Sequence, residues 1–128
     1  MAQAKQILLV DDQADAIDAL AMLLELDGHG VRTAYSGADA LAVVETFIPD
    51  VALIDVSMPD MSGMHLVQLL RSNPALANTR LIALTGYAGD ADKKKAAEAG
   101  FDAHVTKPVS MDQLTRLVAE AGGDRPAT

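Results

Sequence analysis

The chain has 128 residues, a formal net charge of −8 and no cysteine, and its length is typical of one domain that buries its own core. The absence of cysteine excludes disulfides, thiolate metal sites and a cysteine nucleophile, and with no secretory signal pattern we expect a cytoplasmic location. The acidic balance disfavours direct binding to nucleic acid, and no stretch approaches the ~18 apolar residues of a membrane span.

The first half of the chain alternates strand-like and helix-like segments. Short apolar runs predict strands at 6–10, 31–35 and 51–55. Between them, apolar residues recur at the i, i+3, i+4, i+7 spacing of a helix. The first helix is expected to end at Asp27-Gly28, where glycine can cap it, and the second to begin at Ser36-Gly37. The side chains expected to face the core from these two helices are Ile17, Leu20, Ala21, Leu24, Leu41, Val44 and Phe47.

The alternation continues in the second half of the chain. After a loop at 59–63, helices are predicted at 64–72, near 92–99 and from a cap at Ser110 onward. Strands are predicted at 80–85 and 102–106. The helix near 92–99 is rich in alanine and lysine, so we expect it to be the least firmly packed. The inward side chains expected on the other two helices are Leu66, Leu69, Leu70, Leu114, Leu117, Val118 and Ala121.

Regular strand–helix alternation predicts an α/β fold with a doubly wound, five-stranded parallel sheet of the flavodoxin-like type and five helices on its two faces. We expect one domain over residues 1–121, with 122–128 as a tail or the stub of a linker. In such sheets, functional residues lie at the carboxyl ends of the strands, near the point where the strand order reverses.

Polar residues stand where four of the predicted strands end. Asp11 and Asp12 follow the first strand, Asp55 ends the third, Thr85 ends the fourth, and Lys107 follows the fifth. Three carboxylates close together need a cation, and oxygen ligands favour a hard ion such as Mg²⁺. An aspartate beside Mg²⁺, a lysine and a hydroxyl form a set suited to accepting a phosphoryl group.

Each of these residues also has a structural explanation when it is taken singly. Asp12 could be only the cap of the first helix, Thr85 a turn residue, and Lys107 a solvated surface lysine. Their convergence on one edge of the sheet favours the functional interpretation.

Four segments resemble the receiver domain of two-component response regulators. The matching motifs are Ile7-Leu8-Leu9-Val10-Asp11-Asp12, residues 51–63 with Asp55 and Met58-Pro59-Asp60, Leu84-Thr85-Gly86, and Thr106-Lys107-Pro108. The likeness covers about residues 5–121. It implies the strand order 2-1-3-4-5 and a protein that catalyses only its own phosphorylation and dephosphorylation, and it does not separate a stand-alone regulator from a receiver of a hybrid histidine kinase.

The resemblance also implies a role for each residue. Asp55 would accept a phosphoryl group from a phosphohistidine of a sensor kinase or phosphotransfer protein. Asp11, Asp12, Asp55 and the backbone carbonyl of Ser57 would hold Mg²⁺. Thr85 and Lys107 would contact the phosphoryl group, with a cis peptide between Lys107 and Pro108. The switch pair would be Thr85 and His104, and His104 stands where the family often has Tyr or Phe.

Three other classes of protein are weighed against this interpretation. An Asp-nucleophile phosphohydrolase usually needs a second aspartate two residues after the nucleophile, where this chain has Ser57. A flavodoxin-like electron carrier needs a hydroxyl- and glycine-rich loop after the first strand, and Asp11-Asp12 would repel a flavin phosphate. A receiver-like module that binds partners without phosphorylation would not need the complete acidic set.

Overall fold

The computed structural model describes residues 5–56, 58, 61–86, 90–107 and 109–119; side chains are not described at 90–93 and 111. In chain order, the elements are β1 (Gln6–Val10), α1 (Ala14–Leu26), β2 (Gly30–Ala34), α2 (Gly37–Val43), β3 (Val51–Asp55), α3 (Gly63–Arg71), a short 3₁₀ turn η1 (Pro74–Leu76), β4 (Arg80–Thr85), α4 (Asp90–Ala99), β5 (Ala103–Thr106) and α5 (Met111–Ala119).

The strands form one sheet in which all neighbours are parallel, in the order β2-β1-β3-β4-β5. This confirms the fold class that the sequence predicts and the strand order that the resemblance to receiver domains implies. The chain passes from β1 to the edge strand β2 and then crosses to β3 on the other side of β1. The strand order therefore reverses between β1 and β3, which pair as far as Val10 and Ile54. The carboxyl ends of these two strands border the expected functional edge.

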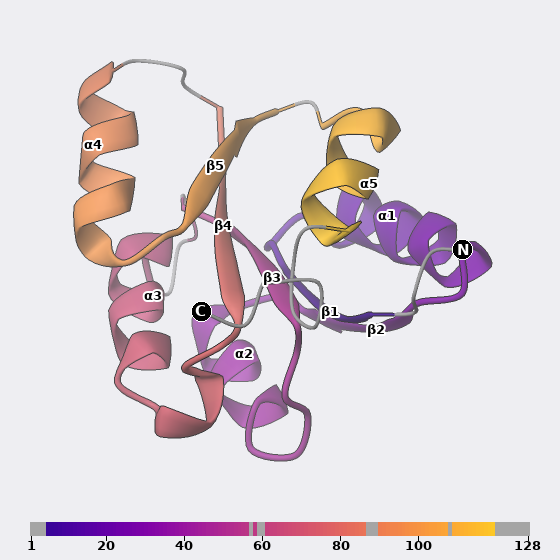
Figure 1. Cartoon of the computed structure of the whole chain (residues 1–128), viewed down its shortest axis with the longest axis horizontal. Helices are drawn as coiled ribbons and strands as arrows, with labels where there is room; N and C mark the ends of the chain where they lie inside the picture. Colours follow the sequence, from indigo (N-terminus) through magenta and orange to yellow (C-terminus); the bar gives the residue numbers. More distant parts are fainter. Residues whose placement is uncertain (1–4, 57, 59–60, 87–89, 108, 120–128) are drawn as a thin grey trace.

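Two apolar layers cover the sheet, with α1 and α5 on one face and α2, α3 and α4 on the other (Figure 1). Successive side chains of a strand point to opposite faces, so each buried strand supplies both layers. In β3, Leu53 packs towards α1 and α5, whereas Ile54 packs towards the other helices. This explains why β3 is buried at every position rather than at alternate ones.

Hydroxyl side chains begin three of the helices. Ser36 Oγ accepts a hydrogen bond from Asp39 N at 3.1 Å, and Ser62 Oγ does the same for His65 N at 3.2 Å. Ser110 Oγ accepts from Gln113 N at 3.2 Å, which confirms the cap predicted there. Each contact satisfies an amide that the first helical turn leaves without an intrahelical partner.

One predicted core residue is wrong. The sequence predicts Leu69 on the inward face of α3, but its side chain is 38% exposed, and Val67 is fully buried in its place. The inward face follows Leu66, Val67 and Leu70, and Leu69 lies about 100° around the helix from Leu70, at the margin of that face. Ala121, also predicted to point inward, lies outside the described residues.

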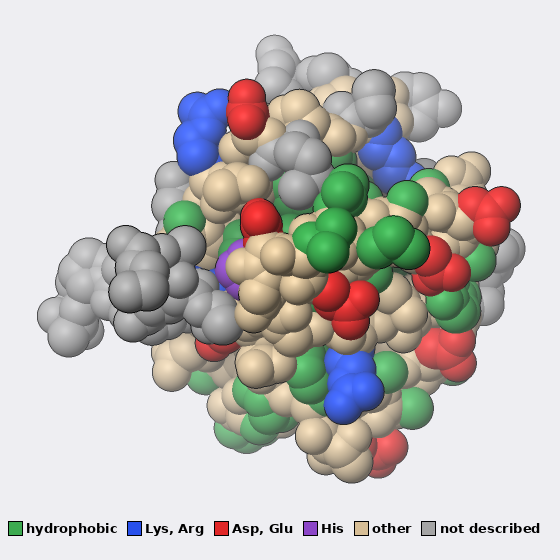
Figure 2. Space-filling view, turned by 90° about the vertical axis from the view of Figure 1, so that its right-hand side faces the viewer, with side chains coloured by type: hydrophobic (Ala, Val, Ile, Leu, Met, Phe, Trp, Pro, Cys, Tyr) green, Lys and Arg blue, Asp and Glu red, His purple; other side chains and the backbone are tan. Residues whose placement is uncertain are grey.

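The surface is acidic with apolar side chains among the charges. Figure 2 looks onto the face that lies at the right in Figure 1 and shows hydrophobic side chains on it, with acidic side chains close to them. The exposed large hydrophobic residues include Met22 and Leu26 of α1. Within the described ranges, none of the helices is long and apolar enough to cross a membrane.

Gly63 lets α3 begin directly against the end of β3. A Cβ atom at this position would lie 2.6 Å from the carbonyl oxygen of Asp55 and 2.6 Å from Val56 Cα. Both atoms belong to the backbone, so they cannot turn away as a flexible side chain could. The absence of a side chain at Gly63 therefore helps to fix the segment that carries Asp55.

We expect Gly63→Ala to lower the free energy of unfolding by about 1–3 kcal/mol, because the added methyl group overpacks the junction of β3 and α3. Urea denaturation measures this loss. Gly86→Ala is the matched control, since a Cβ there meets nothing within 4 Å. Equal stability changes in the two variants would contradict the role given to Gly63.

Candidate phosphoacceptor site

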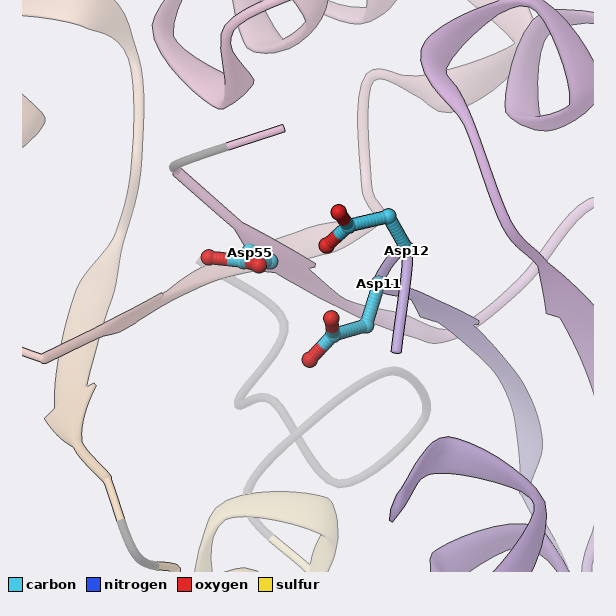
Figure 3. Close-up of side chains that lie close together, drawn as sticks. All are labelled: Asp11, Asp12 and Asp55. Carbon is cyan, nitrogen blue, oxygen red and sulfur yellow. The ribbon is translucent and has the colours of Figure 1, made fainter. Parts of the chain in front are cut away.

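Three aspartates lie together where β1 and β3 end. Asp55 is the last residue of β3, and Asp11 and Asp12 directly follow β1. Oxygen atoms from the three carboxylates lie within 4.8 Å of one another (Figure 3). Asp11 and Asp55 are buried, at 4% and 5% exposure, while Asp12 is exposed. The structure therefore brings together the three acidic residues that the sequence places at neighbouring strand ends.

The alternation of side chains along a strand explains which groups share a face. Leu9 and Leu53 point to the layer of α1 and α5, so Asp11 and Asp55, two residues further along, start from the same face. Val105 belongs to that layer as well, and Lys107 follows it at the same spacing. Asp11, Asp55 and Lys107 are thus directed towards one side of the sheet edge by strand geometry alone.

Lys107 bridges two of the aspartates. Its Nζ atom lies 2.9 Å from Asp11 Oδ2 and 3.4 Å from Asp55 Oδ2. The backbone N–H of Lys107 donates to the Thr85 carbonyl oxygen at 2.8 Å, which ties the segment after β5 to the end of β4. The lysine is therefore held over the cluster by both its backbone and its side chain.

The ionisation of Asp11 reflects opposing effects. Burial acts to raise the pKa of Asp11, but the backbone N–H of Gln13 and the ammonium of Lys107 outweigh burial and lower that pKa. Gln13 N lies 3.0 Å from Asp11 Oδ1. Burial likewise acts to lower the pKa of Lys107, and the hydrogen bond to Asp11 with the charges of Asp55 and Asp11 raises it. Both partners of this ion pair are stabilised in their charged forms.

The cluster suits a hard divalent cation. Three carboxylates face one ammonium group, so the described side chains of the cluster retain net negative charge. Oxygen atoms alone form the cluster, which favours Mg²⁺ or Ca²⁺ over the softer metals that prefer imidazole or thiolate. Two of the three ligand candidates are buried, where uncompensated charge is costly. A bound cation would reduce the repulsion among them.

The predicted switch residues lie on adjacent strands. Thr85 is buried at the end of β4 and pairs in register with Thr106, while His104 of β5 pairs with Ala83 and is half-buried. Since side chains two residues apart share a face, Thr85 and His104 start from the same face of the sheet, opposite to Asp55. Ser57 and Pro108, the other predicted site residues, lie outside the described residues.

Two contributors to the site did not emerge from the sequence. Gln13 occupies the N-cap position of α1, but its side chain makes no capping hydrogen bond. Its backbone N–H donates to Asp11 Oδ1. An aspartate that accepts from an amide two residues later is a common turn, and the Asp11–Gln13 spacing could have indicated it. The structure gives the cap position to Gln13, so the explanation of Asp12 as the cap of this helix is not supported. Gly63 is the second contributor.

The family model for the response regulator receiver domain matches residues 7–119, and the chain belongs to this family. A 14.6 kDa uncharacterised protein from Leptolyngbya boryana is 39% identical over 114 residues, covering 89% of this chain and 87% of that protein. The transcriptional regulatory protein KdpE of Mycobacterium tuberculosis is 38% identical over 88% of this chain. The chain spans 49% of the length of KdpE.

A solved structure supports the same family assignment. The CheY-like receiver domain protein from Methanospirillum hungatei has a TM-score of 0.83 and 31% identity, with 92% of this chain and 93% of that chain covered. Receiver domains act in two-component signalling, so the comparisons confirm the family that the four sequence motifs indicated.

We predict that Mg²⁺ stabilises the fold, because a ligand that binds only the native state shifts the unfolding equilibrium. At ten times the dissociation constant the gain is about 1.4 kcal/mol, a rise in Tm of roughly 4–6 °C for a domain of this size. Thermal denaturation with MgCl₂, against NaCl at equal ionic strength, measures it. Asp12→Asn should reduce the rise, while Asp15→Asn, on the exposed first turn of α1, should keep it. An unchanged Tm at saturating Mg²⁺ would refute the metal site.

Proposed function

We propose that this domain is the phosphoacceptor of a two-component phosphorelay, with Asp55 as the residue that is phosphorylated. The observation that carries the proposal is the position of Asp55, a buried carboxylate, in a cluster with Asp11, Asp12 and Lys107. Phosphoryl transfer depends mainly on positioning and charge neutralisation. The cluster supplies both around a single carboxylate.

In the proposed reaction, an Asp55 carboxylate oxygen attacks the phosphorus atom of a phosphohistidine. The new P–O bond forms as the P–N bond breaks, and the electron pair of that bond returns to the imidazole of the donor. A bound Mg²⁺ would neutralise charge on the phosphoryl oxygens. The carboxylates of Asp11, Asp12 and Asp55 are the side chains that would hold this cation, with the carbonyl of Ser57 as a fourth ligand by likeness to the family.

Lys107 exchanges one partner for another in this scheme. Before phosphorylation its ammonium contacts Asp11 and Asp55. Once Asp55 carries a phosphoryl group, the same ammonium can pair with a phosphoryl oxygen, a charge-assisted contact. Its ion pair with Asp11 would keep the ammonium near the site during this exchange. The Thr85 hydroxyl would bind another phosphoryl oxygen.

The consequence of phosphorylation would be a change at the face formed by α4, β5 and α5. Movement of Thr85 towards the phosphoryl group would alter the space next to His104, which starts from the same face of the sheet. A local charge event would then change the populations of two arrangements of this face. The donor would be a sensor histidine kinase or a phosphotransfer protein, and the reader a downstream protein. The domain itself would act as a signalling module of the cytoplasm rather than as an enzyme on other substrates.

We expect acetyl phosphate with Mg²⁺ to add one phosphoryl group to the wild-type protein and none to Asp55→Asn, which lacks the nucleophile. Intact-mass spectrometry measures the gain, with EDTA replacing Mg²⁺ in a parallel sample. Asp15→Asn should be phosphorylated like the wild type. Lys107→Met should gain a smaller fraction of phosphoryl group, because it lacks the ammonium that would pair with a phosphoryl oxygen. A phosphoryl gain that survives in Asp55→Asn would assign the site elsewhere. A wild type that gains nothing from acetyl phosphate and binds no beryllofluoride would favour a phosphorylation-independent interaction module.

A further inference from the structure

One arginine connects three segments at the end of the sheet remote from the aspartates. Arg71, the last residue of α3, donates from Nε to the Gly100 carbonyl oxygen at 2.9 Å and from Nη1 to the Thr79 carbonyl oxygen at 3.0 Å. Its Nη2 atom pairs with the carboxylate of Asp102. A single guanidinium group therefore joins α3 to the residue before β4 and to the turn between α4 and β5. We call Arg71, Gly100 and Asp102 the α4 clamp.

Asp102 connects the clamp to β4. Its carboxylate accepts the backbone N–H of Leu81 at 2.9 Å, and its own N–H donates to the Leu81 carbonyl oxygen at 2.7 Å. Charge-assisted hydrogen bonds of this kind are stronger than neutral ones. The turn after α4 is thus fixed to α3 and to the first residues of β4 at once.

Gly100 allows the arginine to approach the backbone of the turn. Its φ angle is +127°, a backbone conformation that residues with a side chain rarely adopt. A Cβ atom at this position would lie 3.0 Å from Arg71 Cγ. Gly28, which follows α1, also has a positive φ, of +95°, but a Cβ there meets nothing within 4 Å. Gly100 is therefore constrained by its contact with Arg71 as well as by its backbone angle.

The described part of α4 is mostly exposed. Over 94–99, where side chains are described, the buried residue is Ala96, and Lys94, Lys95, Ala97 and Glu98 are exposed. A hollow of about 120 Å³ lies beside the C-terminal end of the helix and the start of β5, where it borders the clamp; it is lined by Ala96, Ala97, Phe101, Asp102, Ala103 and His104. Figure 1 shows α4 at the margin of the molecule, beside α3 and β5.

The clamp and the phosphoacceptor site stand at opposite ends of β4. The strand begins next to the clamp, at Arg80 and Leu81, and ends at Thr85. At about 3.3 Å per residue, Leu81 and Thr85 are roughly 13 Å apart along the strand. Thr85 is therefore separated from the clamped turn by the length of the strand, and it starts from the face of the sheet that α4 covers.

We propose that the α4 clamp is a fixed hinge, and that Arg71 is the positioning residue that confines movement of the α4–β5 face to the end nearer the phosphoryl site. This proposal rests on the proposed function for the cause of the movement, but the hinge itself is a property of the unphosphorylated protein. Without the clamp, the turn at 100–102 would loosen together with the helix, and the face would lose its fixed end.

Amide hydrogen exchange on the unphosphorylated protein tests the hinge directly, because exchange reports local opening separately from global unfolding. In Arg71→Met we expect amides of 96–104 to exchange at least about tenfold faster relative to those of β1, after the loss of hydrogen bonds from a charged group. Arg116→Met, at an exposed arginine of α5, should leave this ratio unchanged. An equal acceleration of β1 and 96–104, or none, would overturn the hinge.

The two glycines provide a second test that leaves the arginine in place. Gly100→Ala should accelerate exchange at 96–104 through the displaced Arg71, whereas Gly28→Ala introduces a similar backbone penalty without touching the clamp and should not. Equal exchange at 96–104 in the two variants would count against the clamp. This comparison also applies if Arg71→Met fails to fold.

Phosphorylation then separates the hinge from the proposed function. In wild type that has gained a phosphoryl group from acetyl phosphate and Mg²⁺, exchange should change at 94–98 and 104–106 but not at 100–102. If 100–102 changes as much as 94–98, the hinge is wrong although the function stands. If the wild type gains no phosphoryl group, the proposed function is in question, and the unphosphorylated comparisons still decide the hinge.

Discussion

The contact of Lys107 with Asp11 and Asp55 is the interaction on which the site depends. Two buried carboxylates at adjacent strand ends repel each other, and one ammonium within 3.4 Å of both offsets part of that repulsion. The compensation is incomplete because Asp12 adds a third negative charge. Partial neutralisation by Lys107 limits the repulsion that would oppose folding. The negative charge that remains still favours binding of a cation, and a phosphoryl group on Asp55 would give the lysine a new partner.

The parallel sheet makes this arrangement possible without long loops to bring the functional groups together. Each functional group needs only to stand at or just beyond the end of a strand, since pairing of β1, β3, β4 and β5 in register brings those ends together. Side-chain alternation then sets the face of the sheet from which each group starts. Asp11, Asp55 and Lys107 start from one face of the sheet, whereas Thr85 and His104 start from the other, towards α3 and α4. Thr85, at the end of β4, would serve both the proposed chemistry and the proposed response, whereas His104 of β5 would serve the response.

The sequence was sufficient for the features that depend on periodicity and on strand ends. The buried run of β3 and the meeting of the three aspartates followed from short apolar runs that end in polar residues, whereas the strand order was implied by the resemblance to receiver domains. It was insufficient where the outcome depends on packing between elements. Leu69 and Val67 are both apolar, and only the docking of α3 on the sheet decides which is buried. The closeness of Gly63 to the Asp55 backbone depends on how α3 docks against the end of β3. The contacts of Arg71 with Gly100 and Asp102 join residues 29 and 31 positions apart, so no local pattern reveals them.

The central claim is that Lys107 stabilises the fold by neutralising Asp55 and Asp11, and a double-mutant cycle tests it most directly. The free energy of unfolding would be measured without divalent cations for the wild type, Lys107→Met, Asp55→Asn and the double variant. The account predicts that Lys107→Met alone lowers the free energy of unfolding by about 1–3 kcal/mol. In the Asp55→Asn background, the same substitution should lower it by roughly 1 kcal/mol less. An identical loss in the two backgrounds would show that the ammonium and the Asp55 carboxylate are not coupled, and would contradict the account.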